Sequence, residues 1–322
     1  MATPAQQLPQ IPITPADRPT FGDRVFRSLC VASAFTALVI VASTFIFMIS
    51  EARPAFRQAG IIGFFSKSIW NGSTGQFGVW GILVGTIIIA IIGLIVAVPT
   101  ALAMALFINE YAPARIGRIL TSAIDLLAAL PSLVFGMWGF YAFKDHLVTV
   151  SEFLSVHLVA LPFFRLSEPS ARLTGSSFIA GVVVGMMIMP IICSISREVM
   201  GRVPRDLCEG ALALGGTRWG MIKSVVLPFG RSGIFGAALL GFGRALGETI
   251  AVALLIGNVD AIANLHVLEQ GAGSVAALIA IRFGEASSLE RSGLVAAGLS
   301  LLLLTFTVSL ISRYIISRKA VR

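Results

Sequence analysis

The chain has 322 residues and a net charge of +8, and 56% of its residues are hydrophobic whereas only 12% are charged. A soluble domain carries about 25% charged residues, so this composition, with a mean hydropathy of +0.90, excludes an ordinary soluble enzyme and indicates a membrane protein with several spans. The cysteines Cys30, Cys193 and Cys208 lack the spacing of metal ligands, which argues against a zinc site and against a disulfide framework.

Residues 1–28 begin the chain with several prolines and few large apolar side chains. We expect a flexible tail here, because the segment cannot bury enough apolar surface to fold. Six apolar runs follow, each near the ~20 residues that a membrane helix needs. They lie at about 29–49, 82–107, 119–143, 175–196, 232–257 and 292–312. The sequence therefore predicts an all-α membrane domain of six transmembrane helices over 29–318, with a short C-terminus, 319–322.

Prolines and glycines indicate how these helices bend and pack. Pro99, Pro131 and Pro190 lie inside three of the runs. We expect each to kink its helix while the bundle satisfies the freed carbonyl. Small residues four positions apart, which let helices approach closely, occur at Gly81/Gly85 and Gly181/Gly185.

The basic residues predict the orientation, because Lys and Arg gather on the cytoplasmic side of membrane proteins. With both termini inside, the N-terminal tail, the loop 197–231 and the C-terminus hold most of the Lys and Arg. The same distribution explains the net charge of +8 without a nucleic-acid partner. The segment 59–71 then lies outside, and it is aromatic but too short to span, so we expect a helix lying on the membrane surface.

The stretch GFGRALGETIAV (241–252) places two charges inside the fifth run. Arg244 and Glu248 are four residues apart and would share one face of a continuous helix, where the glutamate partly neutralises the arginine. An arginine at the centre of a membrane helix costs about 2.5–3.5 kcal/mol on insertion scales. One interpretation is an ion pair that only helps the helix insert. The one we favour is a pair on a solute path, where the guanidinium binds an anion such as phosphate or sulfate through two donors.

Asp125 is the other charge inside a run, about two turns into the third one. It can pair with a cation of a neighbouring loop or interact with a helix N-terminus. It can also line a solute path, as ionisable residues inside membranes often do. Both interpretations stay open, and the structural one is favoured.

The sequence lacks a phosphate-binding loop for ATP. The stretch 215–220 comes nearest, but Met221 follows where that motif needs lysine. The three histidines are widely spaced in predicted outside loops, and no nucleophile and base are recognisable together. We therefore predict no catalytic residue, no metal site and no cofactor bound by this chain.

The loop 197–231 has the pattern of two short helices separated by a break. A helical pattern runs from Glu209 to Leu214, Gly215 and Gly216 stop it, Thr217 can cap a second helix, and Leu227–Pro228 end that helix. The loop is too polar to insert into the membrane. It is either a docking surface for a partner or a plain connector, and the residue pattern alone does not decide between them.

This loop resembles the EAA loop of ABC-importer permeases, in which E-A-A is followed by three residues, G, nine residues and I-x-L-P. The matching residues are Glu209, Gly210, Ala211, Gly215, Val225, Leu227 and Pro228. Two of them depart from the pattern, since the family has alanine at the second position and isoleucine at the first of the last motif. In that family the short helix of the loop sits in a groove of the ATPase subunit.

Three further stretches are similar to the PstC-type permease subunits of phosphate ABC importers. They are GFGRALGETIAV, IDLLAALPSLVFGMWGFYAF (124–143) and FINEYAP (107–113), and the outside insertion 144–174 also resembles that family. The resemblance implies the type I ABC-importer (MetI-like) fold in a bacterial plasma membrane. It also implies that the chain forms half of a path for inorganic phosphate, in which Arg244 and Glu248 assist passage.

The resemblance further implies the partners of the chain. These are a second permease of the PstA type, a homodimeric ATPase of the PstB type that binds ATP and Mg, and an extracytoplasmic phosphate-binding protein of the PstS type. ATP binding would close the ATPase pair, pull on the EAA-like loop and open the kinked helices outward. Three alternatives remain: a permease for another oxyanion such as sulfate or molybdate, a stand-alone channel or ion-coupled secondary transporter, and a scaffolding membrane protein.

Overall fold

The computed structural model describes residues 21–72, 74–257, 259, 265–271 and 273–320. The chain divides into two units, Met1–Ser50 and Glu51–Arg322. The first unit contains most of helix α1 (Phe21–Ala59), which is longer than the predicted first span. Residues 1–20 of the predicted tail lie outside the described part, and the remainder of that tail is helical.

Within the first unit, α1 satisfies its own polar groups. The hydroxyls of Ser28, Thr36 and Thr44 each donate to the backbone carbonyl four residues earlier, at 2.8, 2.9 and 2.9 Å. Hydroxyls bonded in this way are compatible with an apolar surrounding, because no donor is left without an acceptor. The segment therefore suits a membrane-spanning helix.

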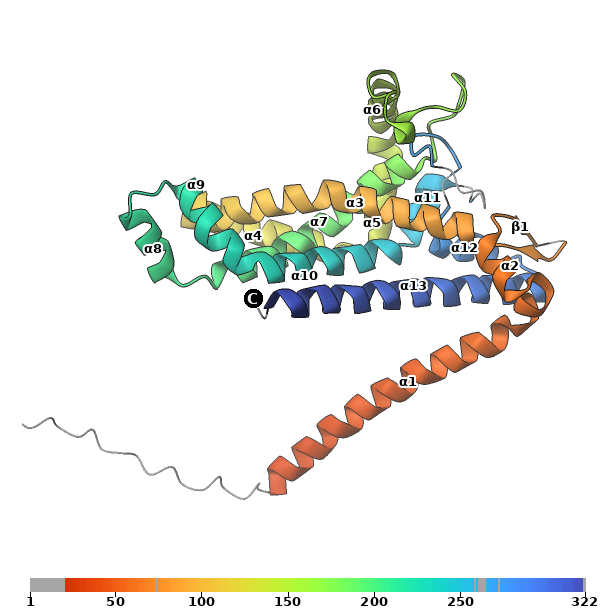
Figure 1. Cartoon of the computed structure of the whole chain (residues 1–322), viewed down its shortest axis with the longest axis horizontal. Helices are drawn as coiled ribbons and strands as arrows, with labels where there is room; N and C mark the ends of the chain where they lie inside the picture. The colour runs from red at the N-terminus through yellow and green to blue at the C-terminus, as the bar shows by residue number, and fades with distance from the viewer. Residues whose placement is uncertain (1–20, 73, 258, 260–264, 272, 321–322) are drawn as a thin grey trace, which may run out of the picture. The chain divides into compact units, whose positions relative to one another are not determined.

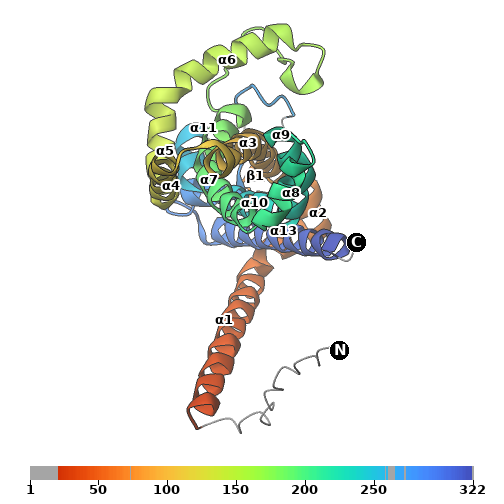
Figure 2. The same cartoon turned by 90° about the vertical axis from the view of Figure 1, so that its left-hand side faces the viewer.

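Four long helices of the second unit run side by side (Figure 1). They are α3 (Trp80–Leu106), α7 (Ser177–Gly201), α10 (Leu227–Leu246) and α13 (Ser288–Ala320). Figure 2 shows α3, α7 and α10 gathered at the centre, with α13 on one side. Pro99 and Pro190 lie inside α3 and α7 without ending them.

Glycines bring α3 and α7 into backbone contact, as the spacing of Gly181 and Gly185 predicted, whereas Gly85 of the other predicted pair lies against Gly273. A Cβ atom added to Gly185 would lie 2.9 Å from the carbonyl oxygen of Gly93, and one added to Gly181 would lie 2.6 Å from the Cβ of Ile92. Real Cβ atoms do not approach other atoms so closely, so only glycine fits at these positions. The crossing of α3 and α7 therefore depends on small residues, as in other membrane helix pairs.

The third predicted span is two helices and not one kinked helix. α4 (Ala114–Ala129) ends before Pro131, and a second helical segment covers Ser132–His157 at an angle of 96° to it. Leu130 is extended, with ψ at 138°, because the ring of a following proline disfavours the helical region. The second segment consists of α5 (Ser132–Trp138), the π-helical turn η2 (Gly139–Phe143) and α6 (Lys144–His157).

The fifth predicted span is also broken. α10 ends at Leu246, and a separate short helix, α11 (Ile250–Ile256), begins after three residues that include Glu248. In the described part of the chain, five helices and the bent pair around Pro131 are long and apolar enough to cross a membrane. The prediction of six membrane segments thus agrees with the structure, although two of the predicted helices are interrupted.

Short elements link these helices at the end of the second unit opposite α8 and α9 (Figure 1). They are α2 (Ile61–Ser66), β1 (Trp70–Asn71), β2 (Gln76–Phe77), η3 (Pro162–Phe164) and α12 (Val275–Arg282). The surface helix expected over 59–71 is only six residues long, and Phe64 is fully buried in it. The last two residues of that segment are β1, which pairs with β2 in an antiparallel hairpin that places Trp70 opposite Phe77.

α13 is joined to the last turns of α1 through one hydroxyl. Ser292 Oγ accepts a hydrogen bond from the backbone amide of Ala55 at 3.2 Å and donates to the carbonyl of Glu51 at 2.7 Å. The hydroxyl therefore bridges the amide of Ala55 and the carbonyl of Glu51, which would otherwise bond directly in a regular helix, next to Pro54. A side chain inserted in this way is a recognised cause of helix bending.

Candidate functional site

Arg244 lies in the last turn of α10, in the wall of a cavity of about 500 Å³ between α10 and α13. The cavity is lined by Gly236, Leu239, Leu240, Gly243, Arg244, Leu246, Thr305, Val308, Ser309 and Ser312. The side chain of Arg244 is exposed, and it makes no hydrogen bond or ion pair with any described residue. A guanidinium at membrane depth needs an anionic or polar partner, so this arrangement leaves Arg244 available to a group from outside the chain.

The opposite wall of the cavity carries three hydroxyls that the sequence reasoning did not identify. Thr305, Ser309 and Ser312 donate to backbone carbonyls of their own helix at 2.9, 2.8 and 2.6 Å. A hydroxyl can exchange such a bond for another acceptor by rotation about its C–O bond. Together with Arg244 they are the polar side chains of an otherwise apolar cavity, which suits a small anion.

Glu248 does not pair with Arg244, contrary to the prediction from their spacing. The helix ends at Leu246, so the two residues no longer share a helical face. Glu248 is only 7% exposed, and its carboxylate accepts a hydrogen bond from the backbone amide of Ala251 at 3.2 Å. Its observed contact is therefore at the start of α11, where backbone amides lack helical acceptors.

Asp125 connects α4 to α7. It accepts a hydrogen bond from the hydroxyl of Ser194 at 2.8 Å, and its carboxylate lies 3.9 Å from the guanidinium of Arg197. Half of the Asp125 side chain is exposed, so this ion pair contributes little free energy by itself. The geometry agrees with the structural interpretation, in which Asp125 holds a neighbouring cation, and a role in a solute path stays a proposal.

The loop that resembles the EAA motif forms two helices around a glycine. α8 (Arg205–Ala213) contains Glu209, Gly210 and Ala211, and α9 (Arg218–Met221) follows. Gly215 lies between them with a φ of 86°, a conformation that favours glycine. Thr217 caps α9, since its hydroxyl accepts a hydrogen bond from the amide of Gly220 at 3.1 Å. The predicted break and cap are therefore confirmed.

The predicted end of the second helix at Leu227–Pro228 is wrong. A π-helical turn, η4 (Ile222–Val226), follows α9 and leads directly into α10, so the helical path continues through Pro228. Proline is tolerated in the first turn of a helix, and Pro228 occupies that position in α10. Val225, Leu227 and Pro228 thus connect α8 and α9 to the helix that carries Arg244.

α8, α9 and the turn between them expose large apolar side chains. Leu207, Leu214 and Trp219 expose 51%, 91% and 58% of their surface. Leu207 and Leu214 lie outside the candidate membrane spans, whereas Trp219 is the second residue of the span Arg218–Leu246. Apolar side chains gathered in this way mark an interaction surface. Cys208 lies on α8. Burial raises the pKa of its thiol, and the carboxylates of Glu110 and Glu209 raise this pKa further.

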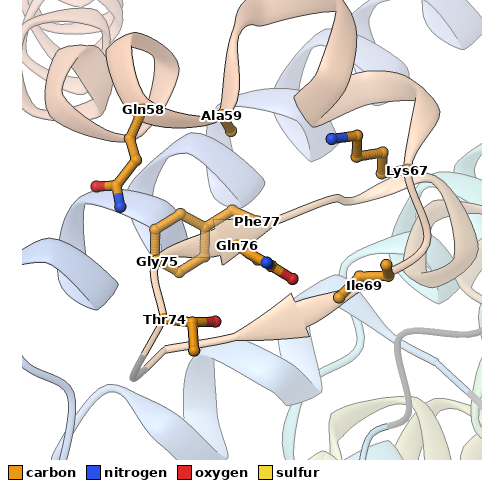
Figure 3. Close-up of a pocket in the computed structure, with 8 residues that line it drawn as sticks. All are labelled: Gln58, Ala59, Lys67, Ile69, Thr74, Gly75, Gln76 and Phe77. Carbon is orange, nitrogen blue, oxygen red and sulfur yellow. The ribbon is translucent and has the colours of Figure 1, made fainter.

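A second cavity, of about 590 Å³, lies beside the hairpin of β1 and β2 (Figure 3). It is lined by Gln58, Ala59, Lys67, Ile69, Thr74, Gly75, Gln76 and Phe77. None of the residues predicted to form a site lines it. Among the residues that the structure describes, no group of three or more His, Cys, Asp or Glu has the arrangement of a metal site.

Comparisons with known proteins show the family of the chain. The model of the family described as "binding-protein-dependent transport system inner membrane component" matches residues 97–321. The Mycobacterium tuberculosis protein named phosphate transport system permease protein PstC 2 is 36% identical over 316 residues, which are 97% of this chain and 96% of that protein.

Two solved structures share the fold. The bacterial alginate ABC transporter, in complex with its pentasaccharide-bound periplasmic protein, matches with a TM-score of 0.60 and 15% identity over 92% of this chain and 97% of the matched chain. The inward-facing methionine ABC transporter MetNI matches with a TM-score of 0.50 and 16% identity over 75% and 94% of the two chains. The fold is that of a type I ABC-importer permease, and the chain belongs to the binding-protein-dependent transport system inner membrane components.

Proposed function

We propose that this chain is the membrane-spanning subunit of an ATP-driven importer and forms half of the translocation path for inorganic phosphate. The observation that carries the proposal is Arg244, an exposed cation without a partner among the described residues, in a cavity between two apolar helices. The name of the Mycobacterium tuberculosis relative, a phosphate transport system permease protein, supports phosphate as the solute. Guanidinium groups bind phosphate through two parallel hydrogen bonds, which fits this choice.

Within the path, Arg244 would bind the anion in transit, and the hydroxyls opposite it would accept or donate the remaining hydrogen bonds. Glu248 lies four residues further along, and its negative charge would lower the affinity of Arg244 for phosphate. This matters because a lone cation in a medium of low dielectric constant would hold a divalent anion too firmly for release. We keep Asp125 as a second, weaker candidate for the path, because its carboxylate is half exposed.

The energy source would be an ATPase on a separate chain. The exposed apolar surface of α8 and α9 provides a place for it to dock, and we call residues 205–221 the docking segment. Residues 209–228 would transmit the movement of the ATPase. The complete importer would contain a second permease of the PstA type, two ATPase chains of the PstB type with ATP and Mg, and a binding protein of the PstS type. With both termini in the cytoplasm, α8 and α9 face the ATPase at the inner surface of the plasma membrane.

The decisive experiment is uptake of radiolabelled phosphate by the complex reconstituted in vesicles, with ATP inside. We expect uptake to require ATP and the binding protein, and an excess of sulfate or molybdate to leave it unchanged. Equal inhibition by sulfate would instead indicate a general oxyanion permease. Uptake driven by an ion gradient without ATP would indicate a secondary transporter and would overturn the proposal.

A further inference from the structure

We propose that the π-helical turn η1 (Phe107–Tyr111) is a mechanical joint that transmits movement of the docking segment to α3 and α7. The inference rests on the proposed function only in requiring an ATPase at α8 and α9. The sequence FINEY of this turn continues α3 without a break, and the following amide of Ala112 closes it by donating to the carbonyl of Phe107 at 2.8 Å. Single π turns inside helices are rare and occur mostly at functional sites.

One contact of the turn reaches the docking segment. Arg218 is the first residue of α9, and its guanidinium donates to the backbone carbonyl of Glu110 at 3.3 Å. The same guanidinium carbon lies 5.9 Å from the centre of the Tyr111 ring, which is within the range of a cation–π contact. Arg218 therefore contacts both the backbone and a side chain of the turn.

A second contact of the turn reaches the core of the bundle. The side-chain amide of Asn109 donates to the backbone carbonyl of Arg197 in the penultimate turn of α7, at 2.8 Å. Arg197 also lies 3.9 Å from Asp125 of α4. Movement of the turn would thus reach α7 through Asn109, and α4 through Arg197.

These contacts provide the continuous physical connection that energetic coupling between distant sites requires. The chain itself connects α9 to α10 through η4, so η1 gives the docking segment a separate route, to α3 and α7. Both routes pass through a π turn, η1 or η4. We infer that Asn109, Tyr111 and Arg218 are positioning residues, which act through the helices and do not touch the solute.

The test uses the whole importer and compares Tyr111→Leu, Arg218→Gln and the double variant. Each single change removes the cation–π contact, so we expect phosphate transported per ATP hydrolysed to fall about five-fold, the effect expected for residues that carry coupling. Assembly with the ATPase and its rate of hydrolysis should stay near the wild-type values. Arg218→Gln also removes the hydrogen bond to the Glu110 carbonyl, so the double variant should be no worse than Arg218→Gln alone. Tyr111→Phe keeps the ring and should keep the wild-type ratio.

If Tyr111→Leu leaves the ratio of phosphate transported to ATP hydrolysed unchanged, the proposal that η1 is a joint is wrong. It is also wrong if the ratio falls only together with lost assembly or a lower melting temperature. A second readout does not depend on phosphate. Ser309→Cys, in a chain whose native cysteines are replaced by alanine, reports access of a thiol reagent to the cavity with and without ATP. We expect Tyr111→Leu to abolish the effect of ATP on labelling, whereas an undiminished effect would overturn the joint even if the wild type transported a different solute.

Discussion

The carboxylate of Glu248, in the break between α10 and α11, accepts a hydrogen bond of 3.2 Å from the backbone amide of Ala251 in α11. This bond gives an amide at the start of α11 an acceptor that the helix itself cannot provide. Glu248 is therefore a structural element of the break, and its charge lies close to the cavity residue Arg244 in the sequence. The two contributions, acceptor and charge, can be separated by substitution.

Glu248→Gln keeps an oxygen acceptor and removes the charge, whereas Glu248→Ala removes both. We expect the alanine variant to lose about 1–3 kcal/mol of stability, because a buried amide is left without a partner, and the glutamine variant to unfold near the wild-type temperature. If the charge tunes Arg244, both variants lose uptake, by about ten-fold for each 1.4 kcal/mol of altered binding. Wild-type uptake by Glu248→Gln would limit Glu248 to its structural role. Thermal unfolding in detergent and vesicle uptake are the two measurements.

Arg244 provides the most direct test of the solute path. Arg244→Gln removes the positive charge, and we expect it to abolish phosphate uptake while ATPase binding and hydrolysis continue. Arg244→Lys keeps the charge but cannot form two parallel hydrogen bonds with phosphate, so we expect the phosphate concentration for half-maximal uptake to rise about ten-fold or more. Uptake at the wild-type rate by the glutamine variant would mean that Arg244 does not contact the solute.

The membrane spans could be predicted from the sequence because the thickness of the bilayer sets a minimum length for apolar runs. The points where these helices break could not be predicted from the sequence. Pro131 was expected to kink a helix but ends one, and the break at Gly247–Thr249 lies in a run with no proline at all. A periodic pattern of apolar residues does not reveal whether the backbone between two segments is helical, because a break of only two or three residues leaves the apolar run nearly intact.

The same limit applies to the candidate site. Arg244 could be recognised from the sequence as an unusual residue, because it is a charge inside an apolar run. The residues of the opposite wall could not be recognised, because Ser309 lies in a different helix and serine is common in membrane segments. The acceptor role of Glu248 also depended on the helix break. In contrast, the glycine turn of the docking segment was predicted correctly, since a helix stop and a cap are local signals.

Gly215 tests the docking segment through backbone strain. An added Cβ would meet nothing within 4 Å, but the φ of 86° is one that other residues adopt only at a cost of about 1–2 kcal/mol. We expect Gly215→Ala to displace α8, and less ATPase to co-purify with the tagged chain. Gly215→Asn should restore part of the binding, because asparagine tolerates this conformation. Gly284→Ala, where φ is not positive and space is also open, is the matched control. Full co-purification with normal transport in Gly215→Ala would contradict the docking assignment.

Cys208 offers a native probe of the same surface. The raised pKa of its thiol lowers the fraction of reactive thiolate at a given pH, so maleimide labelling should be slower than for an ordinary exposed cysteine at pH ~8 and should continue to rise at higher pH. Glu209→Gln removes a negative charge that contributes to the raised pKa, and its labelling at the same pH should be faster. Mass spectrometry of the labelled peptide measures both. Identical rates in the two proteins would mean that the Glu209 carboxylate does not act on Cys208.

The contact between Gly185 of α7 and Gly93 of α3 tests whether the bundle depends on close backbone approach. A methyl group at residue 185 would lie 2.9 Å from a backbone oxygen, so the helices must separate in Gly185→Ala, and we expect a loss of about 1–3 kcal/mol from overpacking. Gly236→Ala is the control for stability, because nothing lies within 4 Å of the added atom and alanine is the better helix former. It should unfold at or above the wild-type temperature. If Gly185→Ala also unfolds at the wild-type temperature, α3 and α7 tolerate a wider separation, and close approach is not what stabilises their pairing.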